Sequence, residues 1–470
     1  MAEQSEVWRL SAKQLHQQYR DGTLTPRVVV QACLARLDEV NPRLNAIISR
    51  RDDAMLSEAN ASTERYAAGK PLSVLDGVPI SIKDNLQTRD QPATWGSPAL
   101  REHHPAADEL PVARLRAAGA LLIGKTNLPE FALEGYTDNP LFGATVNPWN
   151  LALTPGGSSG GAVAGVAAGV SPLALGTDGG GSIRRPASHC GLVGFKPSIG
   201  SIARGEGLPS LLLDFEVIGS LARTVADART LFNVLRGPLP LDRNSYAAAA
   251  ASAICSKTNK PLRILYVPTL SDAPVDPEIA AHCKHATGIF QKMGHTVSED
   301  AMPLALDFMT DAWPLIGQVG LARLFERYPQ WRDSASAKYI DMAEQGARHS
   351  AARLWAIMED VEHLRRDCAN LFNRYDVVIT PATAALPWPA QQAFPPVIAG
   401  QTVGPRGHAI FTGWVNAAGL PALAVPVEPS SSGLPMGIQL ISSYGADDLL
   451  LNLGETYEAA APWAHRWPLL

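Results

Sequence analysis

The 470-residue sequence is poor in charged residues, which make up 18% of the chain, and poor in aromatic residues, which make up 7%. The formal net charge of −5 leaves no excess of lysine and arginine for binding a nucleic acid or an anionic membrane. Hydrophobic residues nevertheless account for 46% of the chain. The composition therefore predicts a large, mainly aliphatic core and neither a nucleic-acid nor a membrane partner.

Cysteine is scarce as well. The five cysteines lie far apart and include no CxxC pair, so the sequence indicates neither a disulfide framework nor a structural zinc site. The eleven histidines form no HxH or HExxH pattern. We expect neither a metal nor any other cofactor.

Long apolar runs are also missing. The first twenty residues carry charges throughout, and no stretch reaches the ~20 apolar residues of a membrane-spanning helix. The absence of a signal peptide and of a membrane-spanning helix predicts a cytoplasmic protein. The 39 glycines and 37 prolines are spread along the chain instead of forming a low-complexity block, which excludes large-scale disorder.

Apolar periodicity predicts an α/β protein. Helical spacing over 8–60, with breaks at Asp21-Gly22 and Pro42, predicts two helices and a connector. Beyond residue 75, short apolar runs alternate with helical stretches, as expected for α/β units. Strands are predicted at 78–82, 120–124, 173–176, 262–267, 295–298, 377–380, 422–427 and 437–441, and helices at 108–118, 161–170, 277–293, 306–373 and 446–461. No repeat or linker interrupts them, so one domain is predicted over 1–470.

The segment 154–200 contains thirteen glycines, and Asp178 is the one charged residue between 151 and 183. Such a segment is expected to be buried. Two glycine-rich loops, 155–161 and 177–182, each carry serine hydroxyls. Glycines allow successive backbone N–H groups to converge on one point, which is how an oxyanion hole is built. Either loop alone could equally be a turn or a helix cap.

A serine nucleophile needs a base, and no histidine stands at the usual triad spacing. Lys83 ends the apolar run 79–82. If it is buried, desolvation lowers its pKa and makes the neutral amine a general base. The alternative is that its ammonium group reaches the surface.

The chain resembles the amidase signature family over most of its length. The motifs that carry the resemblance are Leu10-Ser11-Ala12, Gly77-Val78-Pro79, Lys83-Asp84-Asn85, Gly124 to Phe131, GGSSGG at 156–161, TDGGGS at 177–182, Phe195-Lys196-Pro197, Leu221 to Thr224, Asn416 to Pro421 and Gly433-Leu434-Pro435. The resemblance implies a large mixed β-sheet core covered by helices on both faces. It divides the single domain into a helical N-terminal part (1–60), a signature catalytic core (75–225), a peripheral helical excursion (240–370) and a C-terminal part that returns to the core sheet (375–470).

The resemblance also implies an amidase with a Ser-cisSer-Lys triad. Motif by motif, Ser182 is the nucleophile, Ser158 the bridging serine after a cis peptide bond from Gly157, and Lys83 the base. The amides of the loop that ends at Ser182 would form the oxyanion hole, and these are the amides of Gly179, Gly180, Gly181 and Ser182 itself. The implied reaction forms and hydrolyses an acyl-enzyme on a small-molecule amide. A homodimer is compatible with this function.

Three positions depart from the family pattern. Gly179 replaces the usual threonine but keeps its N–H. Arg185 and Ala409 stand where the family's glutamine-using transamidation subunits carry glutamine and aspartate, which weighs against that role and against glutamine as the substrate. Asp178 and Arg184 are expected to pair with each other instead of contacting substrate.

Other interpretations remain to be compared. Residues 156–160 also fit the GxSxG motif of Ser-His-Asp esterases, with His408 or His465 as the histidine, although the prolines before it make a poor strand. His189-Cys190 suggests a cysteine hydrolase, but adjacent residues rarely face each other. A catalytically inactive subunit would not need the intact triad. A carbamate or urea, as in urethanases, presents a similar carbonyl and is the main alternative substrate.

The aromatic and leucine residues near the motifs predict an apolar pocket that prefers an aryl or alkyl amide to a charged one. The candidate wall residues are Trp95, Phe131, Tyr136, the 208–213 run, Trp313 and Trp414. At least half of them are expected to be ordinary core residues.

Overall fold

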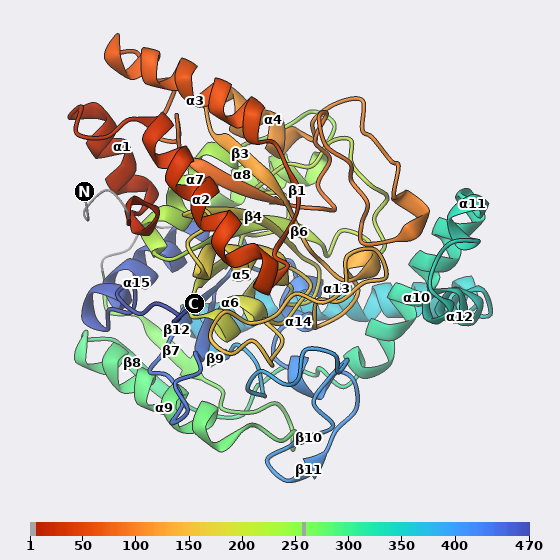
Figure 1. Ribbon diagram of the computed structural model, residues 1–470. Helices are drawn as coiled ribbons and strands as arrows, with labels where there is room; N and C mark the ends of the chain where they lie inside the picture. Colours follow the sequence, from red (N-terminus) through yellow and green to blue (C-terminus); the bar gives the residue numbers. More distant parts are fainter. Residues whose placement is uncertain (1–5, 256–259) are drawn as a thin grey trace.

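A mixed sheet of eleven strands forms the centre of the computed structural model, which describes residues 6–255 and 260–470 (Figure 1). The strand order is β1-β3-β2-β4-β6-β5-β12-β13-β9-β7-β8. These strands are β1 (Ile47–Arg50), β2 (Pro79–Lys83), β3 (Leu121–Thr126), β4 (Leu173–Asp178), β5 (Val193–Lys196), β6 (Val217–Ala222), β7 (Arg263–Tyr266), β8 (Thr296–Glu299), β9 (Val377–Pro381), β12 (Ala422–Pro426) and β13 (Gly437–Ile441). A separate two-stranded ribbon consists of β10 (Val397–Ile398) and β11 (Gln401–Thr402).

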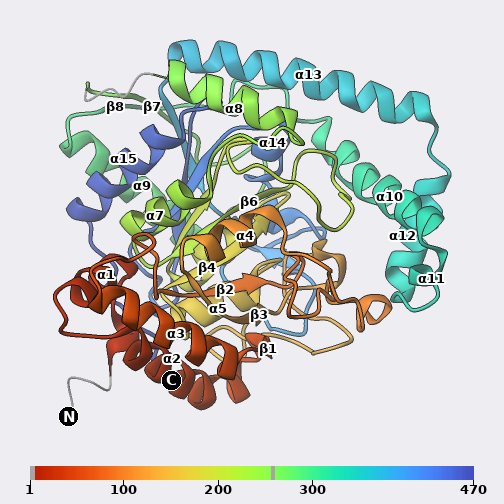
Figure 2. The ribbon, with the colours of Figure 1, turned by 90° about the horizontal axis from the view of Figure 1, so that it is seen from above.

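Helices surround this sheet, and Figure 2 shows α1 to α3 at the lower left, α10 to α12 at the right and the long α13 along the top. The helices are α1 (Ala12–Arg20), α2 (Pro26–Leu44), α3 (Asp52–Ala67), α4 (Leu110–Ala117), α5 (Gly160–Ala167), α6 (Arg184–Cys190), α7 (Val225–Leu235), α8 (Arg243–Ile254), α9 (Pro277–Lys292), α10 (Met309–Arg327), α11 (Pro329–Arg332), α12 (Ala337–Ala347), α13 (Ala351–Arg374), α14 (Gly413–Ala417) and α15 (Asp447–Ala460).

Both faces of the sheet are covered. Along β4, Leu173 and Leu175 belong to the apolar cluster that includes α7, whereas Ala174 packs with α5 and α6. Alternate residues of a strand point to opposite faces, so α7 and the α5–α6 pair lie on opposite sides. β2, β3 and β4 are parallel to one another, and β4 pairs with β6 in antiparallel fashion. The predicted mixed sheet with helices on both faces is therefore confirmed.

The N-terminal part differs from its prediction. It contains the three helices α1, α2 and α3. Between α2 and α3 in the sequence, the short strand β1 pairs with β3 at the edge of the sheet. A break at Pro42 was predicted, but Pro42 lies inside α2 and the helix continues past it. Pro42 is close to the helix end at Leu44, where its missing N–H removes a single hydrogen bond, and buried Val40 and Leu44 anchor the last turn.

The 240–370 segment is mostly helical, but it is not wholly peripheral. β7 lies between β9 and β8 in the main sheet and is parallel to both. Ile264 and Leu265 are buried there, which ties the segment to the sheet edge.

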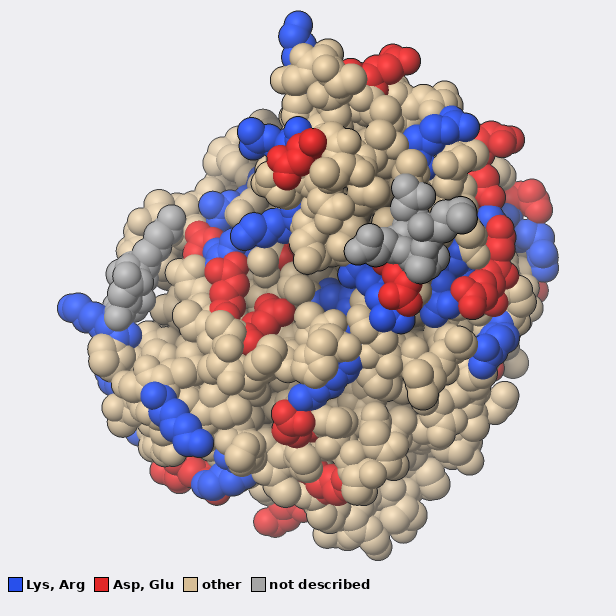
Figure 3. All heavy atoms as spheres, turned by 60° about the vertical axis from the view of Figure 1, so that its left-hand side comes forward, with Lys and Arg blue, Asp and Glu red and all other residues tan. Residues whose placement is uncertain are grey.

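On the face shown in Figure 3, Lys and Arg are interspersed with Asp and Glu. Among the helices that the structure describes, none combines the length and the hydropathy needed to cross a membrane.

Two parallel strands bring the predicted site together. Ile82 of β2 pairs with Leu175 of β4, so the carboxyl ends of both strands lie at the same sheet edge. Lys83 ends β2, and the glycine-rich loop after Asp178 begins where β4 ends.

Candidate active site

Lys83 is fully buried at the end of β2 and does not reach the surface. Its Nζ donates hydrogen bonds to Ser158 Oγ at 2.8 Å, Thr177 Oγ1 at 2.9 Å and Thr177 O at 3.3 Å. Burial lowers the pKa of Lys83 to about 7, and the carboxylates of Glu216 and Asp178 only partly offset this effect. The amine can therefore be neutral near pH 7, as a general base requires.

Ser158 lies directly after a cis peptide bond from Gly157. A Cβ at Gly157 would lie 2.4 Å from Tyr136 O, so only glycine fits there. The next residue connects the two loops: Ser159 N–H donates to Ser182 O at 3.2 Å, and Ser159 Oγ donates to Thr177 O at 3.2 Å. The GGSSGG loop is thus held against both the end of β4 and the loop that carries Ser182.

Ser182 is 6% exposed, whereas Ser158 is 1% and Lys83 0% exposed. Of the three, Ser182 is thus the one nearest to the solvent and to an incoming molecule. Within residues 6–255 and 260–470, Ser182 Oγ makes no hydrogen bond. Lys83 is therefore hydrogen-bonded directly to Ser158, whereas Ser182 is held near them by the bond between its carbonyl oxygen and Ser159 N–H.

The 179–182 loop has both bound and free amides. Gly181 N–H donates to Asp178 Oδ1 at 2.6 Å and is thus already committed. The N–H groups of Gly179, Gly180 and Ser182 have no hydrogen-bond acceptor in the described parts of the chain. Thr412 Oγ1 donates to Gly180 O at 2.7 Å and fixes the orientation of that peptide.

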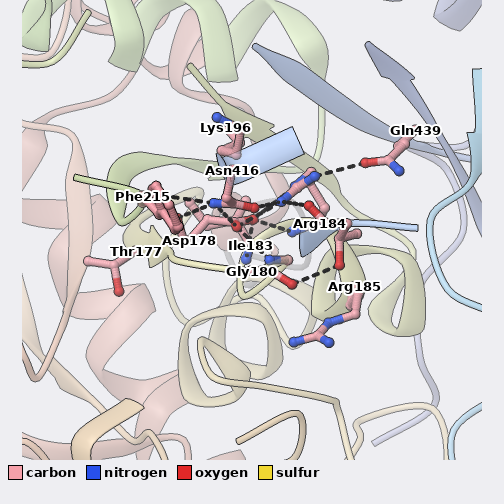
Figure 4. Close-up of polar contacts among 12 residues, drawn as sticks. Thr177, Asp178, Gly180, Ile183, Arg184, Arg185, Lys196, Phe215, Asn416 and Gln439 are labelled. Atoms are coloured by element: carbon pink, nitrogen blue, oxygen red, sulfur yellow. Dashed lines mark hydrogen bonds and ion pairs between the residues drawn. The ribbon is translucent and has the colours of Figure 1, made fainter. Parts of the chain in front are cut away.

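Asp178 and Arg184 form a closed, fully buried ion pair (Figure 4). Arg184 Nη2 donates to Asp178 Oδ1 at 2.9 Å and Arg184 Nε to Oδ2 at 3.0 Å. Burial alone would raise the pKa of Asp178, but Arg184 outweighs it and holds that pKa far below its ordinary range. The predicted mutual pairing is confirmed.

Two further residues complete this pair and were missed in the sequence. Asn416 Nδ2 donates to Asp178 Oδ1 at 3.1 Å, and Arg184 Nη1 donates to Gln439 Oε1 at 2.9 Å. Asn416 lies in one of the motifs that carry the resemblance. The signal for Gln439 was a polar residue inside the apolar strand 437–441.

Some of the candidate wall residues contact the glycine loops. A Cβ at Gly180 would lie 2.4 Å from Trp313 Cζ2, and one at Gly179 would lie 2.6 Å from Leu212 Cδ1. Trp95 and Phe131 pack edge to face, 5.5 Å apart, in a core cluster that also contains Leu212, Trp313 and Trp414. Trp313 and Leu212 therefore belong to the core and also contact the glycine loop.

The geometry does not support the two alternative hydrolase sites. Residues 147–157 contain isolated bridges at Asn147, Asn150 and Leu153 but no strand, so the esterase elbow is not formed. His189 Nε2 donates to Ala385 O at 3.1 Å, and burial raises the pKa of Cys190 well above its ordinary value. A thiol of this kind is not a nucleophile near neutral pH.

A cavity of about 380 Å³ is lined by residues of the segments 199–217 and 241–244. Its lining includes Arg204, Leu208, Glu216 and Val217 but none of the three residues of the predicted triad. Arg204 is paired there with Glu109 and Glu216. The cavity is therefore separate from the Lys83 and Ser158 centre.

Known proteins resemble this chain over almost its whole length. The family model Amidase matches residues 28–451. The whole chain is 34% identical to an acylamidase of Rhodococcus erythropolis, covering 98% of that protein. It is also 34% identical to a Glutamyl-tRNA(Gln) amidotransferase subunit of Synechococcus sp. (strain CC9605), with 95% of each chain covered.

The fold agrees with solved structures as well. A bacterial aryl acylamidase of the amidase signature family superimposes with a TM-score of 0.88 at 28% identity, over 98% of this chain and 99% of that one. A 6-aminohexanoate cyclic dimer hydrolase gives the same values. The chain thus belongs to the amidase signature family, and it is an enzyme that hydrolyses C–N bonds of non-peptide amides.

Proposed function

We propose that this enzyme cleaves a small carboxylic amide through an acyl-enzyme on Ser182. Ser158 relays the proton and Lys83 acts as the base. The observation that carries the proposal is the 2.8 Å contact between Lys83 Nζ and Ser158 Oγ in a buried setting that lowers the lysine pKa to about 7.

Acylation begins when Ser182 Oγ attacks the amide carbonyl carbon. The Ser182 proton passes to Ser158 Oγ, and the Ser158 proton passes to the neutral Lys83 Nζ. The tetrahedral intermediate then collapses, and the proton returns from Lys83 through Ser158 to the leaving amine nitrogen. The C–N bond breaks, and an ester to Ser182 remains.

Deacylation repeats these steps with water as the nucleophile. Lys83 and Ser158 take a proton from water, the ester bond breaks, and Ser182 Oγ recovers its proton. The products are a carboxylic acid and an amine, and the enzyme returns to its starting protonation state.

The negative oxygen of each intermediate would be bound by the free N–H groups of Gly179, Gly180 and Ser182. Gly181 N–H is occupied by Asp178, so Gly181 supports the loop instead of donating to the oxyanion. Donors of this kind typically contribute about 10²–10³ in rate each.

The substrate is proposed to be an aryl or alkyl amide. Trp313 and Leu212 provide apolar surface against the glycine loop, and acylamidases are among the relatives. Arg185 and Ala409 argue against glutamine, the substrate suggested by the family's transamidation subunits. A carbamate or urea would present its carbonyl to the same N–H groups. A cytoplasmic location and a homodimer stay predictions.

The test is hydrolysis of a panel of aryl and alkyl amides, an anilide, an aryl carbamate, an ester and glutamine. Purified wild type is compared with Ser182→Ala. We expect cleavage of apolar amides and of the ester by wild type alone. Activity that persists in Ser182→Ala, or a wild type that cleaves none of the amides, would overturn the proposal.

A further inference from the structure

Arg185 is a buried cation that forms no ion pair with any residue that the structure describes. Arg185 is 4% exposed, and its Nε makes no hydrogen bond within the described ranges. Its one hydrogen bond there runs from Nη2 to Gly157 O and is long, at 3.5 Å. Figure 4 shows the Arg185 guanidinium pointing away from the Asp178–Arg184 pair, which is already closed. Burying an unpaired guanidinium is costly, which favours a function for it.

The position of Arg185 is next to the reaction centre. A Cβ at Gly181 would lie 2.9 Å from Arg185 Nε, so the guanidinium packs against the residue just before Ser182. Its contact with Gly157 O reaches the residue just before Ser158. Arg185 therefore lies between the two loops that carry the serines.

Arg406 adds a second cation on the same side. Its guanidinium carbon lies 5.1 Å from the centre of the Trp313 ring, which in turn packs on Gly180. In the part of the chain that the structure describes, Arg406 forms no ion pair. The two positive charges are close enough to interact. The pKa of Arg185 is lowered to about 9, mainly by burial and next by the charge of Arg406.

The surrounding groups do not neutralise these charges. Glu134 is the acid whose charge acts on both arginines, but it forms an ion pair with Lys338. His189 and His408 lie nearby, and burial lowers the pKa of each, to about 4 for His189 and well below its ordinary value for His408. Both imidazoles are therefore neutral near pH 7 and carry no charge into the site.

We propose that Arg185, assisted by Arg406, binds a carboxylate of the substrate. This inference rests on the proposed function and departs from the sequence-based expectation of an uncharged substrate: the enzyme acts on amides whose aryl or alkyl body ends in a carboxylate, with the body against Trp313 and Leu212. A guanidinium binds a carboxylate through two parallel N–H···O bonds, which would satisfy the orphaned Arg185 Nε.

The test compares charged and neutral amides of equal length. On the acyl side, succinamate, glutaramate and adipamate are compared with butyramide, pentanamide and hexanamide. On the amine side, N-hexanoylglycine and N-hexanoyl-β-alanine are compared with N-hexanoylpropylamine. For wild type, we expect kcat/KM to be at least ~30-fold higher for one carboxylate-bearing amide than for its neutral partner.

The role of Arg185 is then tested by Arg185→Gln and Arg185→Lys. We expect the charged-to-neutral ratio of kcat/KM to fall at least ~10-fold in Arg185→Gln, mainly through KM, and to be partly kept in Arg185→Lys. A merely structural role would lower both activities together and leave the ratio unchanged. The exposed Arg323 provides the matched control, and Arg323→Gln should leave the ratio as in wild type.

If Arg185→Gln does not fold, inhibition of wild type gives the answer. Butyrate should inhibit pentanamide hydrolysis competitively, whereas butanol should not. Wild type that cleaves neutral amides but shows no carboxylate preference and no butyrate inhibition would overturn the subsite and leave the proposed function intact. Wild type that cleaves no member of either series would instead contradict the proposed function.

Discussion

Lys83 Nζ and Ser158 Oγ lie 2.8 Å apart although 75 residues separate them in the sequence. The sheet makes this contact, because β2 presents Lys83 at the edge where β4 ends, and the Ser159 contacts hold the Ser158 loop there. The buried lysine and the serine therefore form one unit.

Removal of the Lys83 amine is expected to abolish amide hydrolysis. Lys83→Met should lower kcat/KM for amides by about 10²–10⁴, and for esters by less, because a poor amine leaving group needs the proton that Lys83 returns. Amide and aryl ester hydrolysis are measured side by side.

The control is the second buried lysine, Lys125, which bonds to Leu86 O and faces Asp84. Lys125→Met removes a buried amine outside the reaction centre and should lower amide and ester hydrolysis to the same extent. Full amidase activity in Lys83→Met would rule out the lysine as the base.

Activity should depend on pH through the neutral form of Lys83. Its pKa is lowered to about 7, so the neutral fraction falls as pH drops below 7 and stays high above it. We expect kcat/KM for a neutral amide to decline about tenfold per pH unit on the acid side, with a midpoint near pH 7. A profile that stays flat down to pH 5 is the result that this assignment does not allow.

The Asp178–Arg184 pair should be a major contributor to stability. Asp178→Asn leaves a buried guanidinium without its counter-charge, which typically costs about 3–5 kcal/mol. The free energy of unfolding in urea measures the loss. Asp214→Asn removes one of the two carboxylates that pair with the partly exposed Arg365 and should cost less than about 1 kcal/mol. Equal losses of unfolding free energy in the two variants would mean that the buried ion pair contributes no more to stability than the partly exposed one.

The same pair gives a pH dependence of stability. The folded-state pKa of Asp178 is depressed, so its contribution is present above the ordinary aspartate pKa and is lost only as pH falls through the lower folded value. Wild type should therefore stay more stable than Asp178→Asn at pH 4. The gap should close only in stronger acid.

Gly180 should not tolerate a side chain. In Gly180→Ala the new Cβ would lie 2.4 Å from Trp313 Cζ2, so the loop or the ring must shift and the proposed oxyanion donors move. We expect kcat to fall at least about tenfold, with a smaller effect on KM. Gly288→Ala, where no atom lies within 4 Å, is the matched control and should keep wild-type kcat. Unchanged kcat in Gly180→Ala would show that this loop does not hold the reacting oxygen.

The sequence predicted the parts of the site that depend on residue type and local pattern. Lys83 at the end of an apolar strand and the two glycine–serine loops were visible as such, and the family resemblance supplied their relation. The long elements of the core were predicted because their periodicity is strong. β1, with four residues, is too short for a periodic signal, and Pro42 lies where a proline costs little.

What the sequence could not show depends on three-dimensional partners. The commitment of Gly181 N–H to Asp178 follows from the shape of one loop and has no sequence pattern of its own. Arg185 reads as one more charged residue beside Arg184. Only the structure shows that Arg184 pairs with a carboxylate and that Arg185 pairs with none among the described residues.

The central claim is that Ser182 is the nucleophile and that Ser158 is not. The most direct measurement is covalent labelling of wild type, Ser182→Ala and Ser158→Ala with an activated aryl phosphonate, followed by peptide mass spectrometry. We predict one adduct on the peptide that contains Ser182 in wild type, a slower adduct at the same residue in Ser158→Ala, and none in Ser182→Ala. An adduct on Ser158, or labelling that persists in Ser182→Ala, would contradict the account.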